Sequence, residues 1–366
     1  MTRRVKDNLF RTHRVDEMMH RAIGLTETTA PHPNPRVGAI VVNPTGEVVA
    51  ERAHIRAGTA HAEAAALADA GPEGRGSTLI VTLEPCAHHG RTPPCVEAII
   101  EAGVDRVFVG ALDPDPRVAG RGIAMLREAG IEVETGIEEA AVVANDPAYF
   151  HHRATGLPLV TLKIATTLDG QSAAADRTSQ WITSAEARSD AHRLRASHDA
   201  VLVGAGTVIA DDPRLDVRLD GYSGRQPRPV VIAGRRPIAS EAAVLQRDPI
   251  IFTRDADISL AGGGAEMVPM PGDIGVDLAG VVKHLGSEGV LSVLIEGGPT
   301  IAGSALAAGI VDQLALYYGA KLAGGIGLPA IAGTLATIDD TLNVSITKIT
   351  PIGPDFRVDA IIKRGT

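Results

Sequence analysis

Four side chains in two short segments of the sequence are those that a hydrolytic zinc site requires. His61 and Glu63 lie in the first segment, and Cys86 and Cys95, the only cysteines of the chain, lie in the second. Zinc binds thiolate and neutral imidazole readily, and a catalytic zinc keeps one coordination position for water, whose pKa it lowers from about 15.7 to about 7. The sequence therefore predicts His61, Cys86 and Cys95 as zinc ligands, with Glu63 left free to move protons.

The segment that follows His61 predicts how these groups can meet. Residues 62–70 (AEAAALADA) end at Gly71 and predict a short helix that begins just after His61. Residues two apart point to nearly opposite sides of a helix, so His61 and Glu63 serve one site only if the metal lies beyond the helix N-terminus. We therefore expect zinc at the tip of this helix.

The first cysteine follows a predicted strand, and the second opens a predicted helix. Residues 78–83 (TLIVTL) are rich in β-branched residues and predict a strand that ends just before Cys86. Pro94 and Cys95 precede a predicted helix over 96–102. A thiol at a helix N-terminus ionises more easily, and this favours metal binding.

The H-x-E and P-C patterns together are typical of zinc-dependent base deaminases, in which the glutamate moves protons and does not bind the metal. That pattern normally ends in C-x-x-C, whereas a longer loop separates Cys86 from Cys95 here. Segment 82–95 (TLEPCAHHGRTPPC) resembles the amino-terminal half of the bifunctional riboflavin-biosynthesis deaminase/reductase family. The resemblance implies a cytidine-deaminase-like, three-layer α/β/α domain that deaminates a pyrimidine, with Glu63 as the catalytic residue.

Two other roles of the cysteines stay open from residue types alone. His88 or His89 could complete a closed zinc site, in which zinc would be only a structural clip of a binding module. Cys86 and Cys95 could instead form a disulfide, but nothing indicates an oxidising compartment. Residues 1–20 are interrupted by charges and contain no apolar stretch, so we predict neither secretion nor a membrane span and expect a cytoplasmic protein.

Length and composition predict a pair of globular domains. The chain has 366 residues, of which 45 % are hydrophobic and 22 % charged, and this length is typical of two or three domains. Aromatic residues make up 3 % and the net charge is −9, a combination poorly suited to stacking bases or neutralising a phosphate backbone. We expect a small-molecule substrate and neither nucleic acid nor membrane as a partner, while monomer and homo-oligomer both stay open.

Strands and helices alternate through the first half, which predicts a layered α/β sheet with helices on both faces. Besides the elements around the zinc ligands, the predicted elements are a hairpin over 37–42 and 48–51, strands over 106–110 and 131–135, and a helix over 123–129. The stretch 145–158 interrupts this rhythm with two prolines and a glycine. We place the domain boundary there, between 1–152 and 153–366.

The second half resumes the alternation. The predicted strands lie at 159–165, 200–204, 229–233, 249–252 and 290–296, and those at 313–318, 344–350 and 356–363 are expected to close the sheet as antiparallel strands. Thr183 and Glu186 have the spacing of a capping box, which predicts a helix that runs to about Ser197.

Two glycine-rich turns of the second half are candidates for holding phosphate groups. The turn 204–207 (GAGT) follows an apolar strand, but Pro213 would end the next helix too soon for a Rossmann unit. The turn 296–300 (EGGPT) leads into a predicted helix over 301–308, whose N-terminal N–H groups suit an anion. From residue types alone, this second turn fits a tight strand-to-helix connection just as well.

The second half resembles the reductase half of the same family in four segments, which are 163–170, 179–183, 204–215 and 296–300. Because segments of both halves occur in the family's order, the resemblance covers nearly the whole chain. It implies a zinc-dependent pyrimidine deaminase domain over 1–152 and a dihydrofolate-reductase-like α/β domain over 153–366 that uses NADPH. The positions that match the family's NADPH contacts are Ala165, Trp181, Thr207, Asp211, Gly298, Pro299, Thr300, Ile301, Ala302, Gly303 and Ser304. The positions that match its substrate contacts are Ser179, Arg195, Leu215, Arg218 and Glu296.

The sequence departs from the family at two positions. Ala60 stands where proline is often found, and Asp216 stands where a small or hydroxylated residue is common. The second departure places an acid near Arg218, an arginine suited to a substrate phosphate.

The resemblance implies two reactions. Hydrolytic deamination of diaminohydroxyphosphoribosylaminopyrimidine is followed by reduction of the ribosyl side chain of 5-amino-6-(5-phosphoribosylamino)uracil to ribityl. Lys163 and Asp211 are the candidate proton donors of the reduction. A deaminase of nucleosides or RNA with an unrelated second half is the competing interpretation.

Overall fold

The chain forms two compact units, Met1–Thr155 and Gly156–Thr366. The computed structural model describes residues 12–89, 93–116, 118–255, 264–273, 275–333 and 337–363. Residues 90–92, which belong to the deaminase-like segment 82–95, lie outside this described part. No helix within it is both long and apolar enough to cross a lipid bilayer.

The first unit is built on a mixed sheet with the strand order β2-β1-β3-β4-β5. Its strands are β1 (Gly38–Val42), β2 (Val48–Ala53), β3 (Thr78–Leu83), β4 (Arg106–Ala111) and β5 (Glu132–Thr135). β1 pairs antiparallel with β2 and β3, and the pairs β3/β4 and β4/β5 are parallel. The hairpin and the three other strands predicted from the sequence are therefore confirmed.

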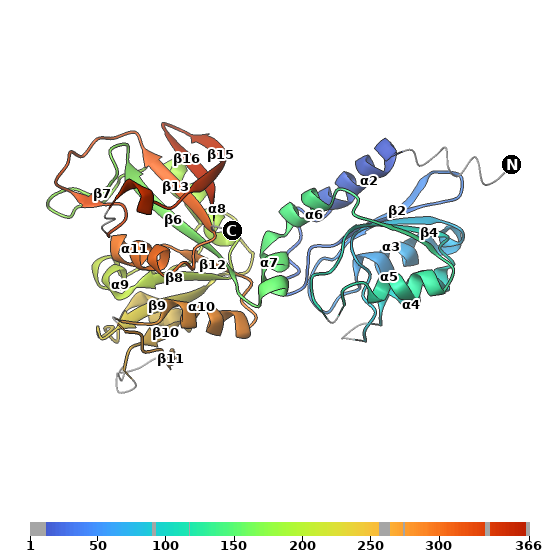
Figure 1. Ribbon diagram of the computed structural model, residues 1–366, viewed down its shortest axis with the longest axis horizontal. Coiled ribbons are helices and arrows are strands. Elements are labelled where there is room, and N and C mark those ends of the chain that lie inside the picture. The colour runs from blue at the N-terminus through green and yellow to red at the C-terminus, as the bar shows by residue number, and fades with distance from the viewer. Residues whose placement is uncertain are drawn as a thin grey trace. The chain divides into compact units, whose positions relative to one another are not determined.

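Helices cover both faces of this sheet. They are α2 (Thr12–Gly24), α3 (Ala62–Ala70), α4 (Cys95–Ala102), α5 (Arg121–Glu128), α6 (Glu139–Asn145) and α7 (Pro147–Thr155), with a short 3-10 helix η1 (Gly71–Gly74) after α3. In Figure 1, α3, α4 and α5 lie on one face, and α2 and α6 lie on the other. Ile40, Ile80 and Phe108 form a buried core with Met19 of α2 and Val142 of α6. The layered architecture expected from the sequence is confirmed.

One segment of the first unit is more regular than the sequence pattern indicated. Residues 145–158 look irregular in the sequence, but α7 occupies most of this stretch. Proline is compatible with the first position of a helix, because the N–H that it lacks would have no partner within the helix there. Pro147 therefore begins a helix instead of breaking one.

The second unit contains a nine-stranded sheet with the order β11-β10-β9-β8-β12-β6-β13-β16-β15. Its strands are β6 (Leu159–Thr167), β8 (Ala200–Gly204), β9 (Arg228–Gly234), β10 (Ile250–Thr253), β11 (Glu266–Pro269), β12 (Ser292–Ile295), β13 (Gln313–Gly319), β15 (Val344–Ile352) and β16 (Asp355–Ile362). The first seven strands of this order, from β11 to β13, are parallel to one another. A separate two-stranded sheet joins β7 (Gln171–Ala173) to β14 (Leu328–Pro329).

The expectation of three antiparallel strands at the edge is only partly correct. β16 is antiparallel to β13 and β15, but β13 itself is parallel to β6. The long connection through α11 (Pro299–Ala307) lies between β12 and β13, and a crossover of this kind returns the chain in the parallel direction.

Helices pack on both faces of this sheet. The α-helices of this unit are α8 (Ala185–Ala196), α9 (Ala205–Asp211), α10 (Leu278–Ser287) and α11, and its 3-10 helices are η2 (Ala243–Arg247) and η3 (Ile338–Asp340). Residues of α10 and α11, such as Val281 and Ala302, pack with Leu202 and Ile295 in one core. Val208 of α9 packs with residues of the opposite face in another core.

The cap of α8 differs from its prediction. Ser184, and not Thr183, is the N-cap, and its side chain accepts a hydrogen bond from the Ala187 N–H at 3.2 Å. The helix therefore starts one residue later than the Thr183/Glu186 capping box implied. Its end at Ala196 agrees with the prediction.

Candidate functional site

His61, Cys86 and Cys95 meet in one cluster of the first unit. The Nδ1 atom of His61 lies 3.2 Å from Sγ of Cys95 and 3.5 Å from Sγ of Cys86. His61 is the extended N-cap residue of α3, and Cys95 is the first residue of α4. Cys86 follows β3, and its sulfur accepts a hydrogen bond from the Cys95 backbone N–H at 3.3 Å. Two helix N-termini and the end of a strand thus converge, as the sequence predicted.

The spacing of the three donor atoms suits zinc. These atoms all lie within 4.8 Å of one another. Bonds of about 2.3 Å to sulfur and about 2.0 Å to nitrogen in a tetrahedron separate nitrogen from sulfur by roughly 3.5 Å. The distances in the cluster are close to this value, so little movement is needed to hold the ion.

Glu63 lies in the first turn of α3 and is buried, with 3 % of its surface exposed. Burial is the main cause that raises the pKa of its carboxyl group to about 7, and the carboxyl also interacts with the thiol of Cys95. Its carboxyl group therefore faces the cluster. Because the cluster lies at the tip of α3, His61 and Glu63 reach the same site from one helix end.

The two thiols form no disulfide, and their pKa values are shifted in opposite directions. The hydrogen bond with Cys95 is the main cause that lowers the pKa of Cys86 to about 4, with help from His61. The same hydrogen bond, together with burial, raises the pKa of Cys95. The disulfide considered from the sequence is absent between these described cysteines.

No fourth histidine, cysteine or carboxylate joins the cluster among the described residues. His88 and His89, the candidates for a closed structural site, are both exposed. Nε2 of His89 instead lies 3.3 Å from Oε1 of Glu97. The described residues therefore fit an open site with three protein ligands.

Glu84 supports the backbone just before Cys86, a role that the sequence patterns did not indicate. This buried carboxylate accepts hydrogen bonds from the backbone N–H groups of Gly120 at 2.9 Å and Gly122 at 3.0 Å. It connects the segment before Cys86 to the start of α5. The signal in the sequence was a charged residue at the end of an otherwise apolar strand, where an acid needs buried partners.

One further histidine stands next to His61 and is held by an asparagine. The ring of His54 packs edge-on against that of His61, with centroids 5.1 Å apart. Nε2 of His54 lies 3.0 Å from the side-chain nitrogen of Asn34. His54 lies in the loop after β2 and Asn34 in a more distant loop, and neither belongs to the H-x-E pattern, so that pattern alone could not identify them.

We expect Gly122→Ala to weaken metal binding without any change of a ligand. A Cβ atom at this position would lie 2.0 Å from the backbone oxygen of Pro85, so the residue before Cys86 must move. The measurement is zinc per chain after purification and dialysis. Gly24→Ala is the control, because nothing lies within 4 Å of its new Cβ. An unchanged zinc content in Gly122→Ala would show that the loop relaxes without displacing Cys86.

The second unit contains a cleft with a volume of about 2290 Å³. It is lined by residues at the carboxyl ends of β8, β9 and β12, the edge at which parallel α/β sheets usually bind ligands. All five predicted substrate contacts line this cleft, and so do the predicted cofactor contacts except two. Ala302 is buried in the core, and a Cβ on Gly303 would lie 1.8 Å from the oxygen of Ala332. The structure thus places these two residues of α11 away from the cleft.

The two glycine-rich turns both border the cleft. The first leads into α9, which has only seven residues because Asp212 adopts a left-handed conformation and Pro213 follows. This short helix confirms that the turn is not part of a Rossmann unit. The second leads into α11, whose N-cap Gly298 provides no side-chain cap, so the N–H groups that follow Pro299 suit a phosphate.

Arg195 and Glu296 form a bidentate ion pair inside the cleft. Nε and Nη2 of Arg195 donate to the two carboxylate oxygens of Glu296 at 2.8 and 3.0 Å, and the side chains are only 13 % and 10 % exposed. Burial raises the pKa of Glu296, but the guanidinium of Arg195 outweighs this effect, so the pKa is lowered overall. Both groups are therefore charged.

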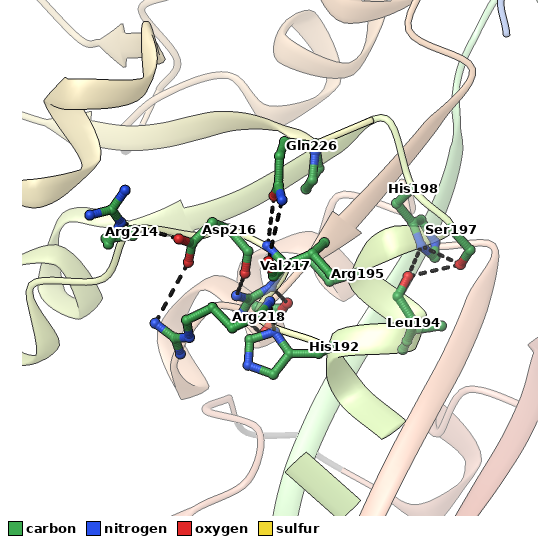
Figure 2. Close-up of polar contacts among 12 residues, drawn as sticks. His192, Leu194, Arg195, Ser197, His198, Arg214, Asp216, Val217, Arg218 and Gln226 are labelled. Carbon is green, nitrogen blue, oxygen red and sulfur yellow. Dashed lines mark hydrogen bonds and ion pairs between the residues drawn. The ribbon is translucent and has the colours of Figure 1, made fainter. Parts of the chain in front are cut away.

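Asp216 lies between two arginines, Arg214 and Arg218, that line the same cleft (Figure 2). Its carboxylate oxygens lie 3.1 Å from Nε of Arg214 and 3.6 Å from Nη1 of Arg218, and its backbone oxygen accepts a hydrogen bond from Arg195. The backbone N–H of Arg218 donates to Nδ1 of His192 at 3.3 Å. The acid that distinguishes this sequence from the family thus pairs directly with the proposed phosphate ligand.

Leu215, the predicted substrate contact beside Asp216, has a left-handed backbone with φ of 55°. Such a conformation costs a non-glycine residue about 1–3 kcal/mol and is concentrated at functional sites. The only tryptophan, Trp181, is 58 % exposed at the cleft and carries the guanidinium of Arg188 over its ring at 4.2 Å. Lys163 also lines the cleft, with Nζ 5.8 Å from the ring centre of Tyr317.

Comparisons with known families match both halves of the chain. Residues 12–111 match the cytidine and deoxycytidylate deaminase zinc-binding region, and residues 158–358 match the RibD C-terminal domain. The second match rules out an unrelated second half, the competing interpretation of the sequence. The zinc-binding region contains His61, Glu63, Cys86 and Cys95.

Similar proteins extend over nearly the whole chain. Riboflavin biosynthesis protein RibD of Bacillus amyloliquefaciens is 41 % identical over 359 residues, which cover 95 % of each chain. The corresponding protein of Escherichia coli K12 is 40 % identical over 88 % of this chain and 92 % of its own.

Solved structures agree with these relatives. RibD of Acinetobacter baumannii has a TM-score of 0.89 and 33 % identity, covering 97 % of this chain and 100 % of its own. A diaminohydroxyphosphoribosylaminopyrimidine deaminase/5-amino-6-(5-phosphoribosylamino)uracil reductase of Thermotoga maritima has a TM-score of 0.87 and 34 % identity, covering 96 % and 99 %. The chain has the α/β fold of these proteins in both units and belongs to the RibD family of riboflavin biosynthesis proteins.

Proposed function

We propose that the chain catalyses two successive steps of riboflavin biosynthesis, one in each unit. The first unit deaminates diaminohydroxyphosphoribosylaminopyrimidine, and the second reduces the ribosyl side chain of 5-amino-6-(5-phosphoribosylamino)uracil with NADPH. The observation that supports this proposal most strongly is the likeness of the whole chain to RibD proteins, with chemically competent residues at both sites.

In the first unit, His61, Cys86 and Cys95 would hold zinc, which would supply the Lewis acid that makes water nucleophilic near neutral pH. Glu63 would take protons from the attacking water and pass them to the ring nitrogen and to the departing ammonia. Its buried position beside Cys95 places the carboxyl group next to the ligand cluster and away from bulk water. Glu84 keeps the Cys86 loop in place by holding the backbone of Gly120 and Gly122.

In the second unit, NADPH bound in the cleft would supply the hydride for the ribose carbon, and the protein would bind and orient the reactants. The N-terminus of α11 would hold cofactor phosphate, and Trp181 would flank the cofactor. Arg195 and Glu296 together offer a fixed donor and acceptor to the substrate. Lys163 and Asp211 are the candidates for the proton that the ribose ring oxygen takes up when its bond to the reduced carbon is broken.

We also propose the cytoplasm as the compartment of this protein. Both cysteines are free thiols, which suits a reducing environment and the binding of zinc. The phosphorylated pyrimidines are the proposed small-molecule partners.

The proposal is tested by incubating the purified chain with the riboflavin-pathway diaminopyrimidine, with and without NADPH. Ammonia and the ribityl product are followed separately. We expect ammonia without NADPH and the ribityl product only with it. Ammonia release that persists after zinc is removed would contradict the first step, and failure to oxidise NADPH with the deaminated substrate would contradict the second.

We expect Asp216→Ser to lower the KM of the reductase substrate by up to about fivefold at unchanged kcat. Asp216 competes with a substrate phosphate for Arg218 and also repels it. Partly exposed ion pairs contribute up to about 1 kcal/mol, which corresponds to about fivefold in affinity. Steady-state kinetics measures the effect, with Asp220→Ser, a nearby exposed acid, as control. A higher KM in Asp216→Ser would instead show that Asp216 positions Arg218 for binding.

A further inference from the structure

Arg236 is an arginine of the reductase cleft that has no described partner. It follows the carboxyl end of β9, lines the cleft and is exposed. Its neighbour Arg235 is paired, with Nε 2.8 Å from Oδ2 of Asp255. For Arg236, by contrast, no ion pair or side-chain hydrogen bond occurs within the described residues. Nη1 of Arg236 lies 3.6 Å from the position of a Cβ on Gly206, so the guanidinium rests against the first turn of α9.

The strand order places Arg236 at one end of the proposed cofactor site. β6, β12, β8 and β9 are consecutive parallel neighbours, so their carboxyl ends lie along one edge. Most of the proposed cofactor contacts belong to β6 and to the turns and first helical residues that follow β12 and β8. The step from β6 to β9 crosses three strand spacings, roughly 14 Å at about 4.8 Å each. An extended dinucleotide that begins at β6 therefore reaches β9 with its other half.

The chemistry of this end of the cleft favours a phosphate. NADPH differs from NADH by one phosphate on the adenosine ribose. In Rossmann folds an arginine accommodates that group whereas an acid binds the free hydroxyl, and the same pairing of charges applies in a cleft of another fold. Asp211 is at the far end of α9, about 7.5 Å along the helix axis from Gly206. The carboxylate of Asp212 accepts the N–H of Ala243 at 2.8 Å. Neither acid has a described contact with Arg236.

We propose that Arg236 binds the 2′-phosphate of the cofactor and thereby sets the preference for NADPH over NADH. This inference rests on the proposed reductase function, because it assumes a nicotinamide cofactor in the cleft. A planar guanidinium with several fixed donors suits a phosphate, and the open position of Arg236 leaves those donors available.

The test compares Arg236→Gln with Arg235→Gln in the full-length chain. Calorimetric titration measures the Kd of NADPH and of NADH for both variants and the wild type. We expect Arg236→Gln to raise the Kd of NADPH about 10- to 100-fold, the range of a charge-assisted interaction. The Kd of NADH should change less than twofold. Arg235→Gln, whose side chain is held by Asp255, should leave both constants within twofold, and Arg236→Lys should restore part of the loss.

A second measurement uses the isolated phosphate group. Adenosine 2′-monophosphate should compete with NADPH on the wild type more strongly than adenosine 5′-monophosphate, and this difference should vanish in Arg236→Gln. Unchanged NADPH affinity in Arg236→Gln, or equal losses for NADPH and NADH, would overturn the inference while the reductase function stands. A wild-type chain that binds neither cofactor would instead reject the reductase function, and the inference with it.

Discussion

Glu63→Gln is expected to reduce ammonia release by about 10²- to 10⁴-fold, the usual contribution of a positioned general acid or base. The amide keeps the shape of the carboxyl group but cannot carry a proton between water, ring nitrogen and leaving ammonia. Because the carboxyl group is not one of the three clustered donor atoms, bound zinc should stay at the wild-type level. The measurement is ammonia formed per chain under saturating diaminopyrimidine, together with zinc content.

Two controls make this result specific. Glu101→Gln removes an exposed acid of α4 and should leave ammonia release unchanged. NADPH oxidation by Glu63→Gln should also match the wild type, because the reductase cleft is formed by residues of the second unit. Undiminished ammonia release would reject the proton-carrying role of Glu63, and a parallel loss of zinc would show that the variant acts through the metal instead.

Arg195→Met is expected to destabilise the second unit by about 3–5 kcal/mol, the usual cost of leaving a buried charge without its partner. Glu296 is 10 % exposed and has Arg195 as its bidentate partner. The double variant Arg195→Met/Glu296→Met should recover most of the loss, since removing both charges also removes their desolvation cost. The free energy of unfolding in urea, followed by a signal of the second unit such as Trp181 fluorescence, measures the effect.

A surface pair provides the matched control for this experiment. Arg228 and Glu266 lie 2.7 Å apart but are 41 % and 42 % exposed, so Arg228→Met should cost less than about 1 kcal/mol. If Arg195→Met lowers the free energy of unfolding no more than Arg228→Met does, solvent must screen the buried pair more than its exposed fraction indicates. If the double variant is as unstable as the single one, the loss comes from packing and not from the unpaired charge.

Local sequence was sufficient wherever a short segment carries its own signal. The helix α3 and the strands β3 and β8 have the bounds expected from their residues, because alanine-rich and β-branched runs bounded by glycine or proline depend little on their surroundings. The ligand types were also readable, since thiolate and imidazole are ligands of zinc and the H-x-E and P-C patterns together are typical of zinc-dependent deaminases. Even the position of the cluster beyond the tip of α3 followed from helix geometry.

Sequence patterns did not predict the structure correctly where two neighbouring residues can both cap a helix, or where the contact partner is distant in the sequence. Ser184 caps α8 although Thr183 and Glu186 have the spacing of a capping box, because the backbone of Ser184 is the one that takes the extended conformation. β13 runs parallel to β6, and no property of residues 313–318 reports the direction of a neighbour. The support of Cys86 by Glu84 depends on a loop near residue 120 that is close only in the folded chain.

The amino-acid sequence by itself determined which chemistry this protein can perform, because residue type sets which atoms bind zinc, carry protons or attract phosphate. Only the tertiary structure decided which of those residues act together. It paired Arg195 with Glu296 and Asp216 with Arg218, turned Ala302 and Gly303 away from the cleft, and left Arg236 open at its edge. The physical reason is that ion pairing and burial act over a few ångströms in space, and chain order does not specify those distances.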